Sequence, residues 1–402
     1  MQQSLGTFFS EYLEKKSIFL DKAVLQSTHL PETLLHRDDQ INLLAQILAP
    51  TLRNEKPSNI FLYGKSGTGK TATIRYVCNE LEKISQTKNI PVKIVYINCK
   101  LKRVADTEYR LVAELARAFH TSIPSTGLPT DEVYRIFIHA VQKENKPIIL
   151  VLDEMDQLVK KIGDSFLYSL TRLNEEVKGT TISIVGISND LVFMDLLDSR
   201  IKSSLSEEEI IFPPYNAIQI QDILLARIAS AFKEEMIDEG VIEKCAAYAA
   251  HEHGDARRAL ELLRVSAELA ERNGFTKLGI QHIDEAEEKI EKDRVIEILA
   301  SQPKQFQAAL YSILTYPSKG GGHKMYTGDV YELYRHVCKR SNLKPLTQRR
   351  ISDILGEFDT LGIVNARIIS KGRYGRTREI MLATPSTLTP KIRRILEESL
   401  DI

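Results

Sequence analysis

The sequence predicts an α/β domain built on a parallel sheet, then an all-helical segment, and finally a small C-terminal domain of three helices and a hairpin. Three observations lead to this prediction. Short apolar runs alternate with helical patterns in the first half of the chain, no strand pattern follows for a long stretch, and a basic, glycine-containing turn separates two apolar runs near the C-terminus. Strands that alternate with helices are typical of a parallel sheet covered by helices.

The sheet itself is expected from five runs rich in Val, Ile and Leu. Near-continuous apolar content of this kind is typical of parallel strands that are buried on both faces. The expected strands cover residues 60–63, 92–97, 147–152, 182–187 and 210–212.

Breaks in these patterns give the domain boundaries. Pro213 and Pro214 end the alternation, and only helical patterns follow until about residue 300. After Pro303, three expected helices precede the basic hairpin, and this order indicates a winged-helix domain. The expected helices cover 304–315, 327–341 and 347–361. The expected organisation is an N-terminal lead (1–20), an α/β base domain (21–215), a helical domain (216–300) and a winged-helix domain (301–402).

Charge is spread unevenly along a chain that is neutral overall. The 402 residues include 54 Lys and Arg and 54 Asp and Glu. Residues 317–382 hold 13 Lys and Arg against 6 Asp and Glu, a local charge of +7, so the remainder carries −7. This asymmetry predicts a nucleic-acid surface at the C-terminal end.

Cysteine usage and hydropathy exclude several classes of protein. The four cysteines lie far apart without a C-x-x-C pair, which argues against a disulfide framework and a zinc site. No apolar run approaches the length of a membrane span, and charged residues interrupt the N-terminus where a signal peptide would be apolar. We therefore expect a cytoplasmic protein without a membrane partner.

A phosphate-binding loop lies between the first expected strand and the helix after it. The stretch matches G-x-x-x-x-G-K-T in the strand–loop–helix context that this motif requires. The glycines let successive N–H groups converge on an anion, and the start of the helix adds partial positive charge. Lys70 is expected to reach the β- and γ-phosphates, and the Thr71 hydroxyl to be a ligand for Mg²⁺. The residues expected to bind ATP or ADP are Gly64, Lys65, Ser66, Gly67, Thr68, Gly69, Lys70, Thr71 and Ala72.

Two acids end the third expected strand, as in a Walker B element. Asp153 is expected to hold Mg²⁺ through water, and Glu154 to polarise the water that attacks the γ-phosphate. Asn189, at the end of the next strand, is expected to orient that water. The alternatives are that the acids only begin a loop and that Asn189 is only a turn residue.

These motifs together resemble an AAA+ ATPase base domain, and the helical segment after residue 216 resembles the AAA+ lid. The stretch from Gly254 to Leu260 is similar to the family's sensor 2 motif, which implies that Arg257 contacts the γ-phosphate. The segment around Arg200 resembles the one that supplies an arginine finger to a neighbouring protomer. Clamp loaders have Ser-Arg-Cys there, whereas this chain has Ser-Arg-Ile.

The order of motifs over roughly residues 20–400 resembles one branch of that family, the archaeal origin-recognition and cell-division-control initiators. The resemblance implies nucleotide contacts by Arg37, in a His-Arg-Asp stretch, by Tyr215 after the two prolines, and by Arg227. It further implies an ATP-hydrolysing initiator that recognises double-stranded origin DNA and helps recruit the replicative helicase. Paralogous initiator subunits are further candidate partners, and a nucleoid-associated location follows.

The winged-helix segment offers two basic elements for DNA. Thr347 can cap a helix whose apolar residues share one face, with Arg349 and Ser352 on the opposite face, which suits a recognition helix in the major groove. The wing would contact phosphates or the minor groove. The residues expected to contact DNA are Gln348, Arg349, Arg350 and Ser352 in the helix and Lys371, Arg373, Tyr374, Arg376 and Arg378 in the wing.

Three other functions stay open at this point. An ATP-sensing transcription regulator would use the same winged helix, and a clamp-loader-like ATPase would bind DNA without sequence preference. A winged helix used only for protein contacts would leave the basic wing solvated. The dedicated winged helix and the absent Ser-Arg-Cys argue against the clamp loader.

Overall fold

The computed structural model describes residues 17–100, 107–124, 127–205, 207–316, 325–360, 363–370, 376–382 and 389–402. The chain forms two compact units, Met1–Glu285 and Ala286–Ile402. Helix α14 (Ile280–Ser301) crosses the boundary between them. Among the described residues, none of the helices combines the length and the apolar character that crossing a lipid bilayer requires.

The first unit contains a sheet, the helices on its two faces and a helical lid. Its elements are η1 (Lys22–Leu25), α2 (Asp38–Leu48), η2 (Ala49–Arg53), β1 (Ile60–Tyr63), α3 (Lys70–Lys88), β2 (Lys93–Asn98), α5 (Glu108–Ala118), α6 (Thr130–Gln142), β3 (Ile148–Asp153), α7 (Met155–Ile162), α8 (Ser165–Thr171), α9 (Leu173–Glu176), β4 (Ile182–Ser188), η3 (Phe193–Leu196), α10 (Ser199–Leu205), β5 (Glu208–Ile211), α11 (Ala217–Ala231), α12 (Val241–His251) and α13 (Ala256–Arg272).

The five strands form one parallel sheet in the order β2-β3-β4-β1-β5. All five expected strands are present. The first has the expected ends, and the ends of the other four differ from the expected ranges by at most two residues. Because the strands are parallel, their carboxyl ends meet at one edge, where ligands of open α/β sheets bind. The ends of β1, β3 and β4 are neighbours there, so the phosphate-binding loop, the two Walker B acids and Asn189 converge.

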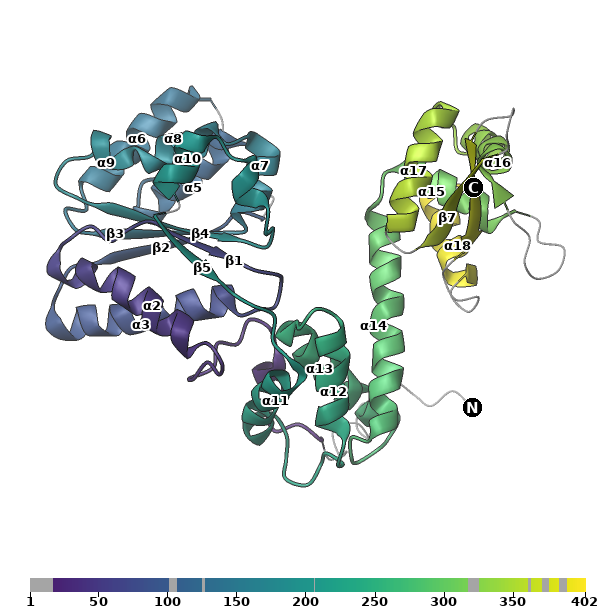
Figure 1. Cartoon of the computed structure of the whole chain (residues 1–402), viewed down its shortest axis with the longest axis horizontal. Coiled ribbons are helices and arrows are strands. Elements are labelled where there is room, and N and C mark those ends of the chain that lie inside the picture. The colour runs from purple at the N-terminus through teal and green to yellow at the C-terminus, as the bar shows by residue number, and fades with distance from the viewer. Residues whose placement is uncertain are drawn as a thin grey trace. The chain divides into compact units, whose positions relative to one another are not determined.

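Both faces of the sheet are covered by helices (Figure 1): α2 and α3 lie on one face, and α5, α6, α8, α9 and α10 on the other. Alternation along β1 shows why this strand is apolar throughout. Ile60 and Leu62 pack into the core under α2 and α3, whereas Phe61 packs into the larger core on the opposite face. A strand with two buried faces needs an apolar residue at every position.

Two of the lid helices, α11 and α13, begin at side-chain caps. Asn216 accepts a hydrogen bond from the N–H of Gln219, and the Gln219 side chain accepts one from the N–H of Asn216, so a capping box starts α11. Asp255 accepts from the N–H groups of Arg257 and Arg258 and starts α13. These caps satisfy N–H groups that the first turn of a helix leaves without partners.

The N-terminal segment packs on the lid, although residues 21–37 are expected in the base domain. The rings of Phe19 and Phe232 stack with centroids 5.2 Å apart, and the N–H of Leu20 donates to the carbonyl of Ala231 at 2.9 Å. Val24 and Leu25 are buried. The chain therefore passes from the lid to the base between residue 25 and the start of α2.

The second unit continues from α14 with a small α/β domain. Its elements are α15 (Lys304–Leu314), β6 (Met325–Tyr326), α16 (Thr327–Arg340), α17 (Gln348–Thr360), β7 (Val364–Ser370), β8 (Arg376–Leu382) and α18 (Thr389–Leu400), and the sheet order is β6-β8-β7. Three helices followed by a two-stranded antiparallel ribbon give the expected winged-helix architecture.

The apolar face of α17 forms much of the core of this unit. Ile351, Ile354, Leu355 and Phe358 are fully buried, as their helical spacing predicts, and the N–H of Arg350 donates to the expected cap Thr347. Strand β6 and helix α18 are not among the expected elements. A strand of two residues is too short to show a periodic pattern. The buried residues of α18 follow the i, i+4, i+8 spacing of a helix, and this spacing could have predicted α18 from the sequence.

A buried asparagine connects the strand before the phosphate-binding loop to its neighbours. The side-chain amide of Asn59 donates to the carbonyl of Ser204 at 2.8 Å and accepts from the N–H of Ile184 at 2.8 Å. We expect Asn59→Ala to lower the free energy of unfolding by about 1–3 kcal/mol, because the buried N–H and carbonyl lose their partners. Urea denaturation followed by circular dichroism measures this change.

Asn79→Ala is the matched control, since Asn79 is exposed on α3. Its free energy of unfolding should stay within about 0.5 kcal/mol of the parent chain. Equal midpoints for both variants would contradict the structural role given to Asn59.

Candidate nucleotide site and nucleic-acid interface

The phosphate-binding loop closes tightly at two glycines, one against the lid and the other against the hinge, residues 213–216 between β5 and α11. Gly67 and Gly69 have φ values of +71° and +91°, which side chains other than glycine rarely adopt. A Cβ on Gly67 would lie 1.7 Å from a carboxylate oxygen of Asp255, and one on Gly69 would lie 2.6 Å from the hydroxyl of Tyr215. Both positions therefore require glycine for conformation and for space.

Lys70 is buried at the start of α3. Its ammonium donates to the carbonyls of Gly64 and Lys65, both at 2.7 Å, so it curls back over the loop that precedes it. Burial, and next the positive charge of Arg257, lower the pKa of Lys70 to about 8, while nearby carboxylates act in the opposite direction. An anion in the loop would offset this desolvation.

Thr71 and Asp153 lie together, one at the start of α3 and the other at the end of β3. The Thr71 hydroxyl donates to the Asp153 carboxylate at 3.0 Å, and the hydroxyl of Tyr96 donates to the same oxygen. The other oxygen accepts the N–H of Glu154 at 3.0 Å. A hydroxyl and a carboxylate are hard oxygen donors of the kind that Mg²⁺ prefers, so the residues present fit this metal.

Glu154 adopts the left-handed conformation, with φ of 57°, directly after the strand. This conformation is uncommon for residues other than glycine and is often found at functional sites. The ammonium of Lys100, after β2, lies 3.7 Å from the Glu154 carboxylate. Lys100 is exposed, so this ion pair can exchange with solvent or with another anion.

Asn189 lies at the end of β4, beside the Walker B acids. Its backbone N–H and the hydroxyl of Ser188 both lie 3.4 Å from one carboxylate oxygen of Asp156, which is buried. The Asn189 side chain is exposed at the sheet edge. Asp156 was not predicted to belong to the site, although its position two residues after Glu154 was a usable signal.

A cavity of 710 Å³ lies between the phosphate-binding loop, the N-terminal segment and the lid. This volume is within the range of small-molecule sites. Residues 26–35 form one wall, and α11 and α13 of the lid form another. Thr71, Tyr215, Arg227 and Arg257 all line it.

Arg37 is buried beside the loop and does not line the cavity. Its guanidinium donates to the carbonyls of Thr68 at 2.9 Å, His36 at 2.8 Å and Pro213 at 2.7 Å. Its carbon Cζ lies 3.8 Å from the ring centroid of Tyr215. Burial lowers the pKa of Arg37. Arg37 was expected to contact the nucleotide. In the structure its hydrogen bonds go to the phosphate-binding loop and the hinge instead.

Arg227 also holds backbone carbonyls. It is 9% exposed, and it donates to the carbonyls of Val24 at 3.1 Å and His29 at 3.3 Å in the N-terminal segment. Burial lowers its pKa. These bonds attach the wall formed by residues 26–35 to α11.

Arg257 and Arg200 are both exposed, in different settings. Arg257 occupies the second position of α13 and lines the cavity near Lys70. Arg200 lies on α10 and forms two hydrogen bonds of 3.0 Å to the carboxylate of Asp198. These bonds lower the pKa of Asp198 to about 2. The Arg200 side chain is 72% exposed, so a second molecule could reach it.

The residues of α17 that are expected to contact DNA belong to the second unit. Arg349 is exposed, and Arg350 lies within 3.9 Å of Asp353 and 3.7 Å of Glu357. Arg378, from β8, lies across the helix, with its Nε 3.4 Å from the Ser352 hydroxyl. The helix and the ribbon therefore bring these cations to one surface.

The other residues that are expected to contact DNA lie at the ends of elements or outside the described residues. Gln348 begins α17, and Arg376 begins β8. Lys371, Arg373 and Tyr374 lie outside the described residues.

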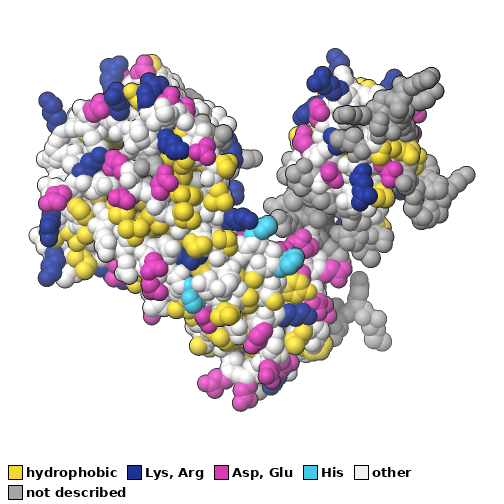
Figure 2. All heavy atoms as spheres, viewed as in Figure 1, with side chains coloured by type: hydrophobic (Ala, Val, Ile, Leu, Met, Phe, Trp, Pro, Cys, Tyr) yellow, Lys and Arg dark blue, Asp and Glu magenta, His cyan; other side chains and the backbone are white. Residues whose placement is uncertain are grey.

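Figure 2 shows basic and acidic side chains on one face of the first unit. Basic and acidic side chains are interspersed over the sheet-containing part, and acidic side chains gather at the end of the lid lowest in that view. Mixed charges of this kind favour solubility.

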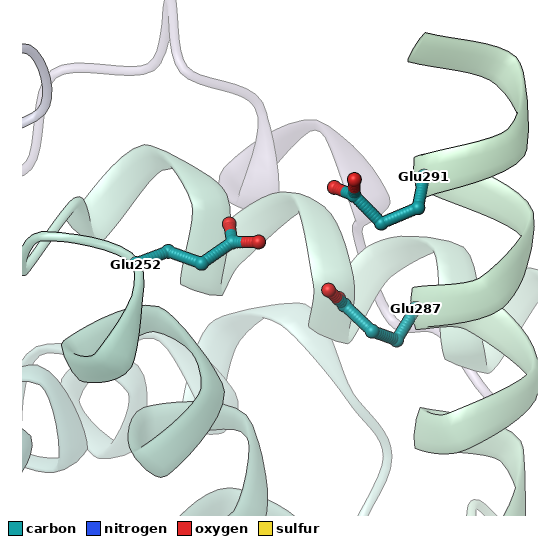
Figure 3. A group of neighbouring side chains, drawn as sticks. All are labelled: Glu252, Glu287 and Glu291. Carbon is teal, nitrogen blue, oxygen red and sulfur yellow. The ribbon is translucent and has the colours of Figure 1, made fainter. Parts of the chain in front are cut away.

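Three glutamates occur away from the phosphate-binding loop. Glu287 and Glu291 project from successive turns of α14, and Glu252 follows the end of α12 (Figure 3). Glu252 pairs with Arg258 at 3.0 Å. Because the first two belong to the second unit and a group of carboxylates by itself indicates no ion, we assign no metal to them.

Four features define the class: the sheet order, the loop between β1 and α3, the two acids at the end of β3, and the capped lid helices. They belong to an AAA+ nucleotide-binding domain with its lid, and a winged-helix domain follows. Comparison with known families agrees with this class. Residues 53–192 match the family described as an AAA domain, residues 221–288 the Cdc6 AAA+ ATPase-type lid domain, and residues 297–389 the CDC6 C-terminal winged-helix domain.

Individual proteins that resemble this chain identify its family within this class. The chain is 51% identical over 391 residues to the ORC1-type DNA replication protein 1 of Methanosarcina mazei, covering 97% of this chain and 94% of that protein. The structure of the Aeropyrum pernix ORC1 protein in complex with DNA matches with a TM-score of 0.84, 41% identity and coverage of 96% and 98%. The Aeropyrum pernix ORC2 protein, determined as ADPNP–ADP complexes, shares the fold with a TM-score of 0.60, 20% identity and coverage of 96% and 100%. The chain belongs to the ORC1-type DNA replication proteins.

The buried position of Arg37 leads to a prediction about stability. We expect Arg37→Lys to lower the free energy of unfolding by about 1.5–3 kcal/mol, because one ammonium cannot donate to three carbonyls that lie in different directions. The midpoint of urea denaturation of the full chain measures the change.

Arg53→Lys, at an exposed position after α2, is the control with the same chemical change. It should leave the midpoint unaltered. If Arg37→Lys also left it unaltered, the hydrogen bonds of Arg37 would contribute nothing to the fold.

Proposed function

We propose that this chain is an ATP-dependent replication initiator that binds double-stranded origin DNA and, in its ATP-bound form, helps to recruit the replicative helicase. One observation carries the proposal: the side chains of an ATP site meet at one sheet edge in a chain that also has a winged helix with an exposed basic surface. Membership in the ORC1-type proteins and the DNA complex of the Aeropyrum pernix relative support it.

ATP binding would use the loop, the cavity and the lid. The Lys70 ammonium uses two of its three N–H donors within the loop, and the third can donate to a phosphate oxygen. The adenosine would lie in the cavity against residues 26–35. Arg257 reaches the same space from the lid, so it would contact the γ-phosphate only when lid and base are closed on each other.

Hydrolysis would require the edge formed by β3 and β4. Thr71 and Asp153 would hold Mg²⁺, which neutralises charge on the phosphate oxygens when it is bound. Glu154 would take the proton of the attacking water, and Asn189 would hold that water in line. Arg200, held by Asp198 on the surface, would serve a neighbouring protomer, for example a paralogous initiator subunit. We propose that this hydrolysis is slow and acts as a switch.

The experiment that tests the function is recovery and sequencing of fragmented genomic DNA bound by the full chain with ATP at physiological salt. A few sharp sites at replication start points would support an initiator. Enrichment at many promoters would support an ATP-sensing transcription regulator. A flat profile would mean that binding involves only phosphates, as in a clamp-loader-like ATPase.

The role of Glu154 gives a kinetic prediction. We expect Glu154→Gln to reduce ATP turnover by roughly 10²–10⁴-fold, because the amide cannot accept the proton of water, while ATP binding changes little. Phosphate release and equilibrium binding of a fluorescent ATP analogue measure the two effects.

Glu175→Gln is the control, because Glu175 is exposed on α9 and pairs only with Arg172 among the contacts described. Its turnover should equal that of the parent chain. Unchanged turnover in Glu154→Gln would refute the assignment of the base.

The exposed face of α17 gives a prediction about DNA. We expect Arg349→Ala to weaken binding to a recovered genomic site by roughly 10-fold, because a base or phosphate contact is lost. Fluorescence anisotropy over a range of salt concentrations separates the two kinds of contact, since loss of a phosphate contact reduces the salt slope.

Arg394→Ala provides the comparison within the same unit. Arg394 is 82% exposed on α18 and pairs with Glu398. This variant should bind DNA as the parent chain does. An equal, small effect of both substitutions would show that α17 is not the recognition helix.

A further inference from the structure

Tyr96, on strand β2, donates a hydrogen bond to Asp153 in the candidate nucleotide site. Among the described residues, no other side chain of β2 forms a hydrogen bond with that site. Strands β2 and β3 pair with Tyr96 opposite Val151 and Asn98 opposite Asp153. Because side chains alternate along a strand, residues 96, 151 and 153 point to the same face of the sheet. The Tyr96 hydroxyl therefore reaches diagonally to Asp153 and donates to its carboxylate.

The carboxylate of Asp153 is held by three donors. Thr71 and Tyr96 donate to one oxygen, and the N–H of Glu154 donates to the other. An ionised carboxylate offers about four acceptor positions. These three hydrogen bonds fix the plane of the carboxylate and leave one position for a metal-bound water.

Arg75 fixes Tyr96 in turn. Its guanidinium carbon lies 4.3 Å from the centroid of the Tyr96 ring, and Arg75 follows Thr71 by one helical turn on the same face of α3. Arg75 also lines the cavity. A guanidinium stacked on the ring restricts rotation of the tyrosine and leaves its hydroxyl directed at Asp153.

We propose that Tyr96 is a positioning residue for the metal site: its hydroxyl, held in place by Arg75, orients the Asp153 carboxylate for the water of a bound Mg²⁺. This proposal rests on the proposed ATP-binding and Mg²⁺-binding function. Residues that orient a metal ligand commonly contribute 10–100-fold to metal affinity. Tyr96 would thus act on the metal and leave the binding of metal-free nucleotide unaffected.

The test compares Tyr96→Phe with the parent full chain in equilibrium binding of a fluorescent ATP analogue. The analogue is first bound in the presence of EDTA, and Mg²⁺ is then added at saturating nucleotide. The Mg²⁺ midpoint is the free Mg²⁺ concentration at which half of the fluorescence change has occurred. We expect the affinity in EDTA to change by less than about 2-fold, and the Mg²⁺ midpoint to rise by roughly 10-fold. Free Mn²⁺ measured by electron paramagnetic resonance gives the metal affinity by a second route, without reference to turnover.

Tyr63→Phe is the matched control. The Tyr63 hydroxyl also donates to a carboxylate on the neighbouring strand, that of Glu209 at 3.3 Å, but it packs with the core on the opposite face of the sheet. Its Mg²⁺ midpoint should equal that of the parent chain. A midpoint shifted equally in both variants would mean a general effect on the sheet and would overturn the proposal.

Arg75→Lys tests the same contact without altering Tyr96. Lysine keeps the charge and loses the planar stack, so we expect a smaller shift of the Mg²⁺ midpoint in the same direction, even if Tyr96→Phe does not fold. Unshifted midpoints in the variants that fold would overturn the positioning role. A parent chain whose nucleotide binding does not respond to Mg²⁺ would overturn the proposed metal site itself, and the parent titration alone distinguishes that outcome.

Discussion

The arrangement of loop, hinge and N-terminal segment depends on one buried guanidinium. Arg37 is desolvated without a carboxylate partner among its hydrogen bonds, and such burial is costly unless its donors are satisfied. Three carbonyls and the face of Tyr215 satisfy them. Because the carbonyls belong to Thr68, to Pro213 and to its own neighbour, the charge is stable only while loop, hinge and N-terminal segment keep these positions. Arg37 therefore couples the geometry of the phosphate-binding loop to that of the hinge.

The wall of the cavity depends on a second buried arginine. Arg227 attaches the carbonyls of Val24 and His29 to α11, while Phe19 stacks on Phe232 at the end of the same helix. Residues 26–35 thus run from an attachment on the lid to an attachment on the base at Arg37. A wall held at both ends keeps its shape only for one arrangement of lid and base, so nucleotide in the cavity would favour that arrangement.

The sequence predicted those parts of the site that are local in the chain. The loop from Gly64 to Thr71 and the acids at the end of β3 were recognisable because glycine spacing and an apolar run followed by acids are short-range patterns. Tyr96 could not be recognised, because its contact with Asp153 depends on the register of β2 against β3, which the sequence does not state. Arg37 and Arg227 were expected beside the nucleotide, but whether an arginine faces a ligand or a carbonyl depends on packing between distant segments. The same reason explains why residues 17–25 were not predicted to pack on the lid.

The side chains of the candidate site are held in place in two different ways, one at the sheet edge and the other in the cavity. At the sheet edge, Asp153 and Asp156 are each held by hydrogen bonds from neighbouring strands and helices, so the groups proposed for hydrolysis are fixed by the rigid core. The cavity wall and Arg257 belong instead to the N-terminal segment and the lid, which meet the base through the hinge, Arg37 and the loop. A change in the hinge would therefore alter nucleotide contacts before it altered the hydrolytic groups. This order of sensitivity suits the proposed switch, in which the nucleotide acts through the lid. Loss of the lid contacts would remove the proposed contact of Arg257 with the γ-phosphate, while Thr71, Asp153 and Glu154 would stay in place.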